Sequence, residues 1–447
     1  RAEALFLQEE LVAAAQELVW VAQKADDIRL REKALEVLPR LAEKSHTRQE
    51  RKRLEEIAVQ VPAAPQIPQG AVVVLLAFPE EEVPEACALR QSIEFAVEHG
   101  SVRFPVMFRE ARSSFECAQV AGEILSSESV RLLLFAGDEG SATTLALLGD
   151  KYRVPILLLT GYAHSLTRLS DYVFEFLPSR CTQSSALAEF AVEDLKIRSF
   201  LELVVSNAEG HALEEGFRGR VEKTGAVIEA VEWYSQNASS IRASLRNLFS
   251  ASRGSRRQGG ELSAAVSDSE MAALWGTRDG EVLFLSKDDS LKGPPISGDE
   301  GLFFAIPSGR AADMASQIGS LPQSTVLLGN SAWIDAQSLE EFPEVSENLI
   351  VSAPLLPDVE AVEGLQQLYE DSVGRRAGLW ELLGLDAVSF LAGILQEEPD
   401  SPRAVCENLL KSGPFTGASV RLDFRGEREN KAVRILRYEN GTFTALK

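Results

Sequence analysis

The residues with the clearest binding chemistry are Gly140 and Ser141, which precede a predicted helix that begins at Ala142. The first NH groups of a helix have no partners within the helix, and they attract anions. The Ser141 hydroxyl is a further donor, so this pair is suited to hold a carboxylate. Ser141 is equally suited to cap the helix, which is a purely structural role. Both interpretations stay open at the level of the sequence.

Residue types that perform catalysis form no recognisable motif in this chain. Gly137 and Gly140 are not followed by the Gly-Lys-Ser/Thr of a phosphate-binding loop. The segment from Gly329 to Trp333 lacks the second glycine of a nucleophile elbow. The histidines lie far apart in the sequence, at His46, His99, His164 and His211. We therefore expect a protein that is not an enzyme and uses no metal or cofactor.

The composition excludes several kinds of partner. The chain has 447 residues, with 67 Asp and Glu against 45 Lys and Arg, and its formal charge is −22. Nucleic-acid binding and docking on an anionic membrane both require concentrated basic surfaces, so we expect neither. No apolar run approaches the ~18 residues of a membrane-spanning helix. The length predicts about three folding units.

The cysteines and the N-terminus bear on the cellular compartment. Cys87, Cys117, Cys181 and Cys406 are widely spaced. They are either buried free thiols or, in an oxidising compartment, include a disulfide between Cys87 and Cys117. The chain begins at Arg1 without a visible signal peptide, so we interpret it as a mature fragment or a trimmed chain.

Residues 1–61 are predicted to be helical throughout. Apolar residues recur at helical spacing at Leu11, Ala15, Leu18 and Ala22, at Ala34, Leu38 and Leu41, and at Leu54, Ile57 and Ala58. Three short helices resemble the end of a tetratricopeptide-like array. Residues 62–70 contain three prolines and a glycine, and they predict a semi-rigid linker.

From residue 71 the pattern changes to short apolar strands that alternate with helices. This alternation predicts α/β architecture with parallel, doubly wound sheets in two units. The predicted strands are 71–78, 102–108, 131–136, 155–159, 200–205, 227–231, 302–306 and 325–328, and the helices are 85–99, 115–125, 142–152, 184–194 and 213–224. Residues 250–300 predict a partly ordered insertion with one strand at 281–286. Helices 359–374 and 385–395 follow, and then antiparallel strands 424–438 and 442–446 that join near Asn440-Gly441.

This order of elements resembles the type I periplasmic-binding-protein fold, which branched-chain amino-acid receptors share. The resemblance rests on residues 132–144 (LLLFAGDEGSATT), 154–160 (VPILLLT), 172–179 (YVFEFLPS), 413–417 (GPFTG) and 423–426 (DFRG). It implies a first lobe of residues 71–179 and 352–422, and a second lobe of residues 180–351 and 423–447. The chain crossings near residues 179, 352 and 422 would then form a hinge.

The same resemblance implies a ligand site in the cleft between the lobes. The implied contacts are Gly140, Ser141, Thr160, Gly161 and Tyr162 in the first lobe, and Asn207, Glu209, Asn330, Ser331 and Trp333 in the second. The amino-acid receptors place a carboxylate for the ligand's ammonium in the second of the second-lobe loops. This chain has Asn330 and Ser331 there, and an ammonium without a counter-charge is costly to bury. Glu209 is an alternative counter-charge or a solvated surface residue, and we do not expect a free amino acid as ligand.

The helical start combined with this fold is similar to a narrower group, the bacterial envelope lipoproteins that activate penicillin-binding proteins. Residues 305–311 (AIPSGRA) and 327–333 (LLGNSAW) carry this similarity. It implies protein–protein contact with a peptidoglycan synthase and a cleft without a small ligand.

Two functions follow as expectations. The first is a non-catalytic bilobed protein of the bacterial cell envelope that binds a small polar solute, as a substrate-binding or sensor domain for an ABC-type membrane transporter. The alternative is the activator of a peptidoglycan synthase. Both imply a periplasmic or envelope location, with a lipid anchor on a segment outside this sequence. The acidity of the chain lowers the odds of a polyanionic ligand.

Overall fold

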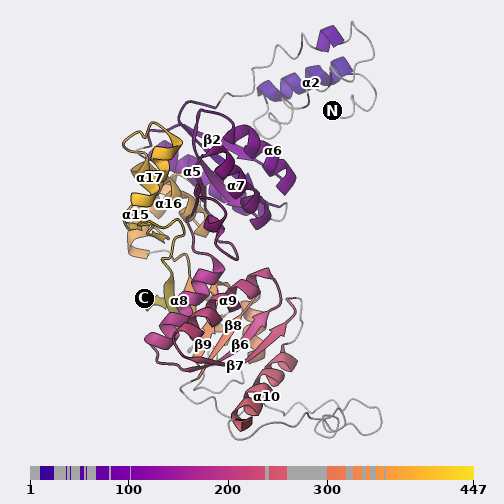
Figure 1. Ribbon diagram of the computed structural model, residues 1–447. Helices are drawn as coiled ribbons and strands as arrows, with labels where there is room; N and C mark the ends of the chain where they lie inside the picture. The colour runs from indigo at the N-terminus through magenta and orange to yellow at the C-terminus, as the bar shows by residue number, and fades with distance from the viewer. Residues whose placement is uncertain are drawn as a thin grey trace. The chain divides into compact units, whose positions relative to one another are not determined.

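The computed structural model divides the chain into two units, Arg1–Pro68 and Gln69–Lys447 (Figure 1). The structure describes residues 11–24, 37, 41, 51–54, 57, 67–79, 82–100, 102–236, 241–258, 300–318, 326–334, 339–342, 349–356 and 359–446. Most of the predicted linker at 62–70 lies outside these residues, and so does the strand predicted at 281–286.

The described part of the first unit contains helix α2 (Leu11–Lys24). Leu11 and Ala15 of the predicted apolar stripe are buried, and Leu18 packs against the same cluster. Leu41 and Leu54, from the two other predicted helices, are also buried in it. The bounds of those two helices lie outside the described residues, so the tetratricopeptide-like character of this segment stays a prediction.

The first sheet of the second unit has five parallel strands in the order β2-β1-β3-β4-β5. The predicted strand–helix alternation is confirmed, although the second strand begins later than expected. Because β2 and β3 lie on opposite sides of β1, the winding of the sheet reverses there, which is where α/β proteins place their sites. The elements are β1 (Ala71–Ala77), α5 (Val83–His99), β2 (Val106–Glu110), α6 (Ser114–Leu125), β3 (Val130–Gly137), α7 (Glu139–Tyr152), β4 (Ile156–Leu158), η2 (Leu166–Arg168) and β5 (Val173–Glu175).

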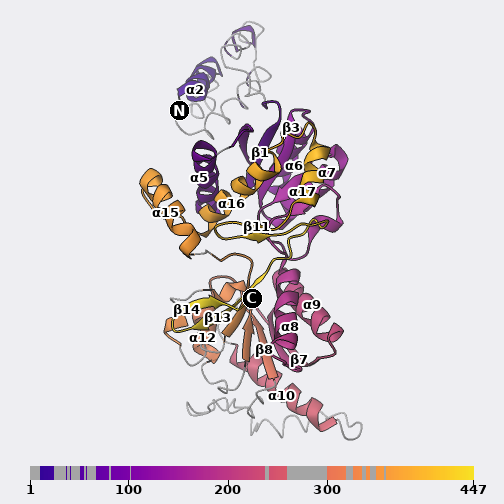
Figure 2. The ribbon, with the colours of Figure 1, turned by 90° about the vertical axis from the view of Figure 1, so that its left-hand side faces the viewer.

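The second sheet has seven strands in the order β14-β13-β10-β9-β8-β6-β7. Strands β6 to β10 are parallel, whereas β13 and β14 form the predicted antiparallel pair (Figure 2). Strand β13 begins at Arg434, ten residues later than predicted. Asn440 and Gly441 join that pair with φ angles of 51° and 79°, as a two-residue hairpin turn requires. The elements are α8 (Arg180–Glu193), β6 (Ser199–Val205), α9 (Ala208–Lys223), β7 (Val227–Tyr234), α10 (Arg242–Gln258), β8 (Glu300–Ala305), α12 (Ala311–Ile318), β9 (Val326–Gly329), η3 (Ser331–Trp333), β10 (Leu349–Ala353), β13 (Arg434–Glu439) and β14 (Thr442–Ala445).

The chain returns to the first sheet after β10. The returning elements are α15 (Val359–Val373), α16 (Leu379–Ile394), α17 (Pro402–Lys411), β11 (Phe415–Thr416) and β12 (Arg421–Leu422). Helix α16 begins six residues before the predicted start at 385, and α17 was not predicted. The core of the first sheet combines Val72 and Val74 of β1 with Leu391 and Leu409 from α16 and α17. We call the part built on the five-stranded sheet the first lobe, and the part built on the seven-stranded sheet the second lobe.

Two of the segments that pass between the lobes are bonded to each other. The Glu429 carboxylate accepts hydrogen bonds from the hydroxyl of Ser179 at 2.8 Å and from its NH group at 3.3 Å. Asn430 donates to the carbonyl of Phe176 at 2.9 Å.

Phe424, which the predicted boundary at 422 assigns to the second lobe, packs in the core of the first lobe. The start of the predicted insertion, residues 250–258, belongs to helix α10.

Candidate functional site

A cavity of about 900 Å³ lies at the carboxyl ends of β1, β3 and β4. Its wall is completed by residues that follow β6, β9 and β10, so both lobes contribute. This volume is within the range of small-molecule sites, and the position next to β1 is a topological switch point. The lining comprises Phe78, Pro79, Glu82, Gly137, Asp138, Glu139, Thr160, Gly161, Tyr162, Ala163, Leu177, Leu379, Trp380 and Leu383 of the first lobe, and Arg180, Ala208, Glu209, Ser331, Ile334, Pro354, Leu355 and Leu356 beyond it.

The predicted anion-binding pair at the start of α7 does not line this cavity. Helix α7 begins at Glu139, three residues earlier than predicted, and its N-cap is Asp138 rather than Ser141. The Asp138 carboxylate accepts the NH group of Ser141 at 2.9 Å and its hydroxyl at 2.5 Å. Ser141 is buried as a result, and Gly140 lies in the first turn. The chain's own carboxylate therefore occupies the position that was predicted for a ligand.

Thr160, Gly161 and Tyr162 do line the cavity, as a loop that follows β4. The Thr160 hydroxyl donates to the Tyr162 hydroxyl at 2.6 Å, and both lie 3.3 Å from the carbonyl oxygen of Gly137. Burial raises the pKa of Tyr162, so this group stays protonated. A Cβ atom at Gly161 would lie 2.9 Å from the carbonyl oxygen of Pro178, so the close approach of these two segments needs glycine.

The predicted residues of the second lobe divide into two groups. Glu209 and Ser331 line the cavity, whereas Asn207, Asn330 and Trp333 do not. The side chain of Asn207 caps α9 by accepting the NH group of Gly210. The buried Asn330 amide bonds both backbone groups of Ile306, at 3.0 and 2.9 Å. Trp333 is fully buried and donates to the carbonyl of Phe304 at 2.9 Å, so it belongs to the core.

An apolar wall of the cavity was not predicted. Phe78 directly follows β1, and Trp380 lies in the first turn of α16. Their rings meet edge to face, with centroids 5.7 Å apart. Leu379 and Leu383 extend this surface along α16. The phenylalanine after a buried strand was a usable signal in the sequence, but nothing there connects it with a tryptophan about 300 residues later.

The charged groups of the lining are mainly acidic. Glu82, Asp138, Glu139 and Glu209 stand against Arg180. The Arg180 guanidinium pairs with Glu209, with Nε 2.8 Å from Oε1. Glu139 accepts the NH group of Ala163 at 3.2 Å, which ties the start of α7 to the loop after β4.

A further carboxylate, that of Glu175, is buried behind the loop after β4, at the end of β5. It accepts the Leu166 NH group and the Ser165 hydroxyl, each at 2.7 Å. Desolvation outweighs these bonds and, with Glu429 and Glu139 nearby, raises the pKa of Glu175 to about 8. Glu175 and Glu429 belong to the two bonded segments, so the carboxylates of both lie where the chain passes between the lobes.

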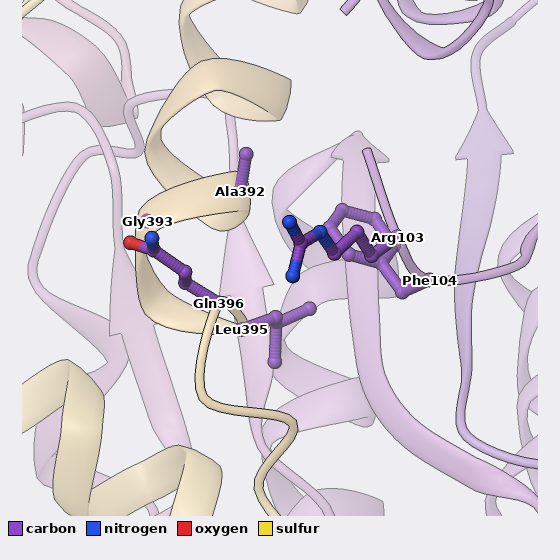
Figure 3. A pocket seen from close by; sticks show the side chains of 6 residues that line it. All are labelled: Arg103, Phe104, Ala392, Gly393, Leu395 and Gln396. Carbon is purple, nitrogen blue, oxygen red and sulfur yellow. The ribbon is translucent and has the colours of Figure 1, made fainter. Parts of the chain in front are cut away.

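A smaller cavity of about 240 Å³ lies elsewhere on the first lobe (Figure 3). Arg103 and Phe104 enter it from the segment before β2, and Ala392, Gly393, Leu395 and Gln396 line it from the end of α16. The Arg103 guanidinium points toward the last turn of that helix in Figure 3. A cation at this place stabilises the C-terminal end of a helix, which gives Arg103 a structural explanation.

Other sequence predictions concern cysteine, histidine and the membrane. The structure has the four cysteines as free thiols, with Cys117 and Cys406 buried and Cys87 exposed, so the disulfide alternative is not formed. His164 pairs with Glu215 of α9 across 3.0 Å. Within the described parts of the chain, no group of three or more His, Cys, Asp or Glu side chains is arranged to hold a metal ion. None of the described helices combines the length and apolar character that crossing a bilayer requires.

Comparison with known proteins places this geometry in context. No protein-family model matches the chain, and no curated protein matches it by sequence. A crystal structure assigned to a branched-chain amino acid ABC transporter from Rhodospirillum rubrum matches with a TM-score of 0.63 and 13% identity, over 85% of this chain and 100% of that chain. A leucine-binding protein of Thermotoga maritima matches with a TM-score of 0.57 and 14% identity, over 85% and 98% of the two chains.

A third structure is similar to the same extent. A solute-binding protein of an ABC transporter from Rhodopseudomonas palustris, in complex with 3,4-dihydroxybenzoic acid, matches with a TM-score of 0.57 and 12% identity, over 84% of this chain and 95% of that chain. The similarity covers 84 to 85% of this chain and so reaches across both lobes. The two lobes of this chain therefore have the type I periplasmic-binding-protein fold.

Proposed function

We propose that this chain is a non-catalytic, bilobed ligand-binding protein of the cell envelope that takes a small solute into the 900 Å³ cavity, as the binding component of an ABC-type transporter or sensor. The observation that carries the proposal is the cavity itself, because both lobes line it at the carboxyl ends of parallel strands. Closure of the lobes about the crossing segments would surround the solute and exclude water.

The chemistry of similar structures supports solute binding. The Thermotoga maritima structure is a leucine-binding protein, and the Rhodopseudomonas palustris structure holds an aromatic acid. A periplasmic location and an ABC transporter as partner come to this chain through the same similarity. A lipid anchor and contact with a peptidoglycan synthase stay predictions.

Native mass spectrometry of the purified full chain tests the proposal, because a ligand enclosed by two lobes survives purification. We expect a bound species of defined mass. We also expect Trp380→Ala to weaken its affinity about tenfold, since that substitution removes part of the apolar wall. Trp233→Ala is the matched control, because the Trp233 ring contacts His211, with centroids 4.3 Å apart, and does not line the cavity. An empty chain whose melting temperature is unchanged by amino acids, sugars, amines and aromatic acids would reject ligand binding.

A further inference from the structure

The start of helix α7 faces the cavity with a carboxylate already in place. Asp138 lines the cavity and caps the helix, and it accepts both the NH group and the hydroxyl of Ser141. These donors are the groups with which a helix N-terminus holds an anion. A ligand carboxylate at this point would have to displace Asp138 or lie beside it, and like charges at short range repel.

The other charged groups of the lining also disfavour a ligand carboxylate. Glu82, Glu139 and Glu209 are acidic, and the guanidinium of Arg180 is engaged by Glu209 at 2.8 Å. The described lining therefore carries four carboxylates and one cation. Partly enclosed walls of low dielectric strengthen this field, so a cation entering the cavity gains energy and an anion loses it.

Another part of the wall is apolar and aromatic. Phe78 and Trp380 meet edge to face, and Leu379 and Leu383 lie beside Trp380 on α16. This surface suits the hydrocarbon or ring portion of a solute. Aromatic rings add to the attraction for a cation that lies over their faces.

We propose that the solute is an apolar or aromatic amine, a molecule with a cationic head and a hydrocarbon body and without a carboxylate. The acids around the start of α7 and α9 hold the ammonium group, and the wall formed by Phe78 and Trp380 holds the body. This inference rests on the proposed function, since it assigns a chemical class to the solute of the same cavity.

A matched pair of probes with one carbon skeleton separates the two charges. Phenethylamine carries an ammonium group and phenylacetate a carboxylate, and isothermal titration calorimetry of the full chain at pH 7 measures both. We expect the amine to bind at least tenfold more tightly than the acid. Tighter binding of phenylacetate would overturn the inference and leave solute binding in place. Absence of binding by both would also overturn it. The proposed function itself is rejected only if the chain is empty in the mass spectrum and no solute of the panel changes its melting temperature.

Asp138→Ser tests the residue that decides the charge preference. Serine is a good N-cap, so the helix keeps its start while the carboxylate is lost. We expect amine affinity to fall at least tenfold and phenylacetate affinity to rise. Asp150→Ser is the matched control, because Asp150 is exposed in the last turn of the same helix. If Asp138→Ser does not fold, Glu139→Gln provides the test, and unchanged amine affinity in a folded variant of either residue would contradict the assignment.

Discussion

Replacement of Asp386 by alanine is expected to lower the free energy of unfolding by about 3 to 5 kcal/mol. The Asp386 carboxylate is buried on α16 and accepts four hydrogen bonds from the turn between β11 and β12. The donors are the NH groups of Ala418, Ser419 and Val420 and the Ser419 hydroxyl, at 2.5 to 2.9 Å. Alanine would leave buried donors without partners, which costs more than the loss of the bonds themselves.

Chemical denaturation of the full chain measures this effect through the shift in midpoint. Asp371→Ala is the matched control, because Asp371 is exposed on α15 and its carboxylate accepts a hydrogen bond from Gln367, one turn earlier in the same helix. We expect the control to change stability by less than about 0.5 kcal/mol. A loss below about 1 kcal/mol for Asp386→Ala would show that the turn finds other acceptors, and the structural role would be rejected.

Replacement of Glu202 by methionine is expected to raise the free energy of unfolding more at pH 8 than at pH 4.5. The difference between the two effects is on the order of 4 kcal/mol. Glu202 lies on β6, is fully buried, and neither carboxylate oxygen has a hydrogen-bond partner among the described residues. Desolvation, supported by Glu214 and opposed by Arg218, raises the pKa of Glu202 from 4.5 to about 8. The neighbouring Glu222 acts in the raising direction as well.

The sign of the pH dependence follows from proton binding. Between pH 4.5 and about pH 8 the folded chain keeps the Glu202 proton and the unfolded chain loses it. The free energy of unfolding therefore falls as the pH rises through this window, and the methionine variant lacks the part of this fall that Glu202 causes. The pKa of Glu175 is also raised to about 8, so the variant still loses stability over the same pH range through Glu175. Denaturation midpoints from pH 4 to 9 measure how steeply stability depends on pH, and Glu123→Met, at an exposed position, is the control. An unchanged pH dependence in the Glu202→Met variant would contradict the raised pKa of Glu202.

The fold could be predicted from the sequence because local and global signals agree in it. The buried strand β1 is a continuous apolar run, and β3 contains one from Leu132 to Ala136. Asn440-Gly441 is a turn signal whose positive φ angles the structure confirms. Helix α17 had a signal that was not recognised, namely Ser401 at the N-cap and Pro402 in the first turn. Its position beside the first sheet is set by packing, which a local pattern does not contain.

The candidate site was harder to predict than the fold. Glycine is unfavourable inside a helix, which agrees with a predicted start of α7 after Gly140. In the structure Asp138 caps the helix earlier, so Gly140 lies in its first turn. Asn330 and Trp333 are in a loop near the cavity, yet their side chains satisfy buried backbone groups. Trp380 reaches the cavity through tertiary packing against Phe78, which no local spacing reveals.

The mixed composition of the first core has a consequence for how the chain folds during synthesis. Strands β1 to β5 leave the ribosome long before α16 and α17, whose side chains complete the same core. The second lobe likewise lacks β13 (Arg434–Glu439) long after β10 has been made, although β13 pairs with β10. Each lobe is completed only by segments that follow its first strands by more than 80 residues. The apolar faces of both sheets must therefore stay soluble during translation, and such non-local completion predicts slow folding with dependence on chaperones.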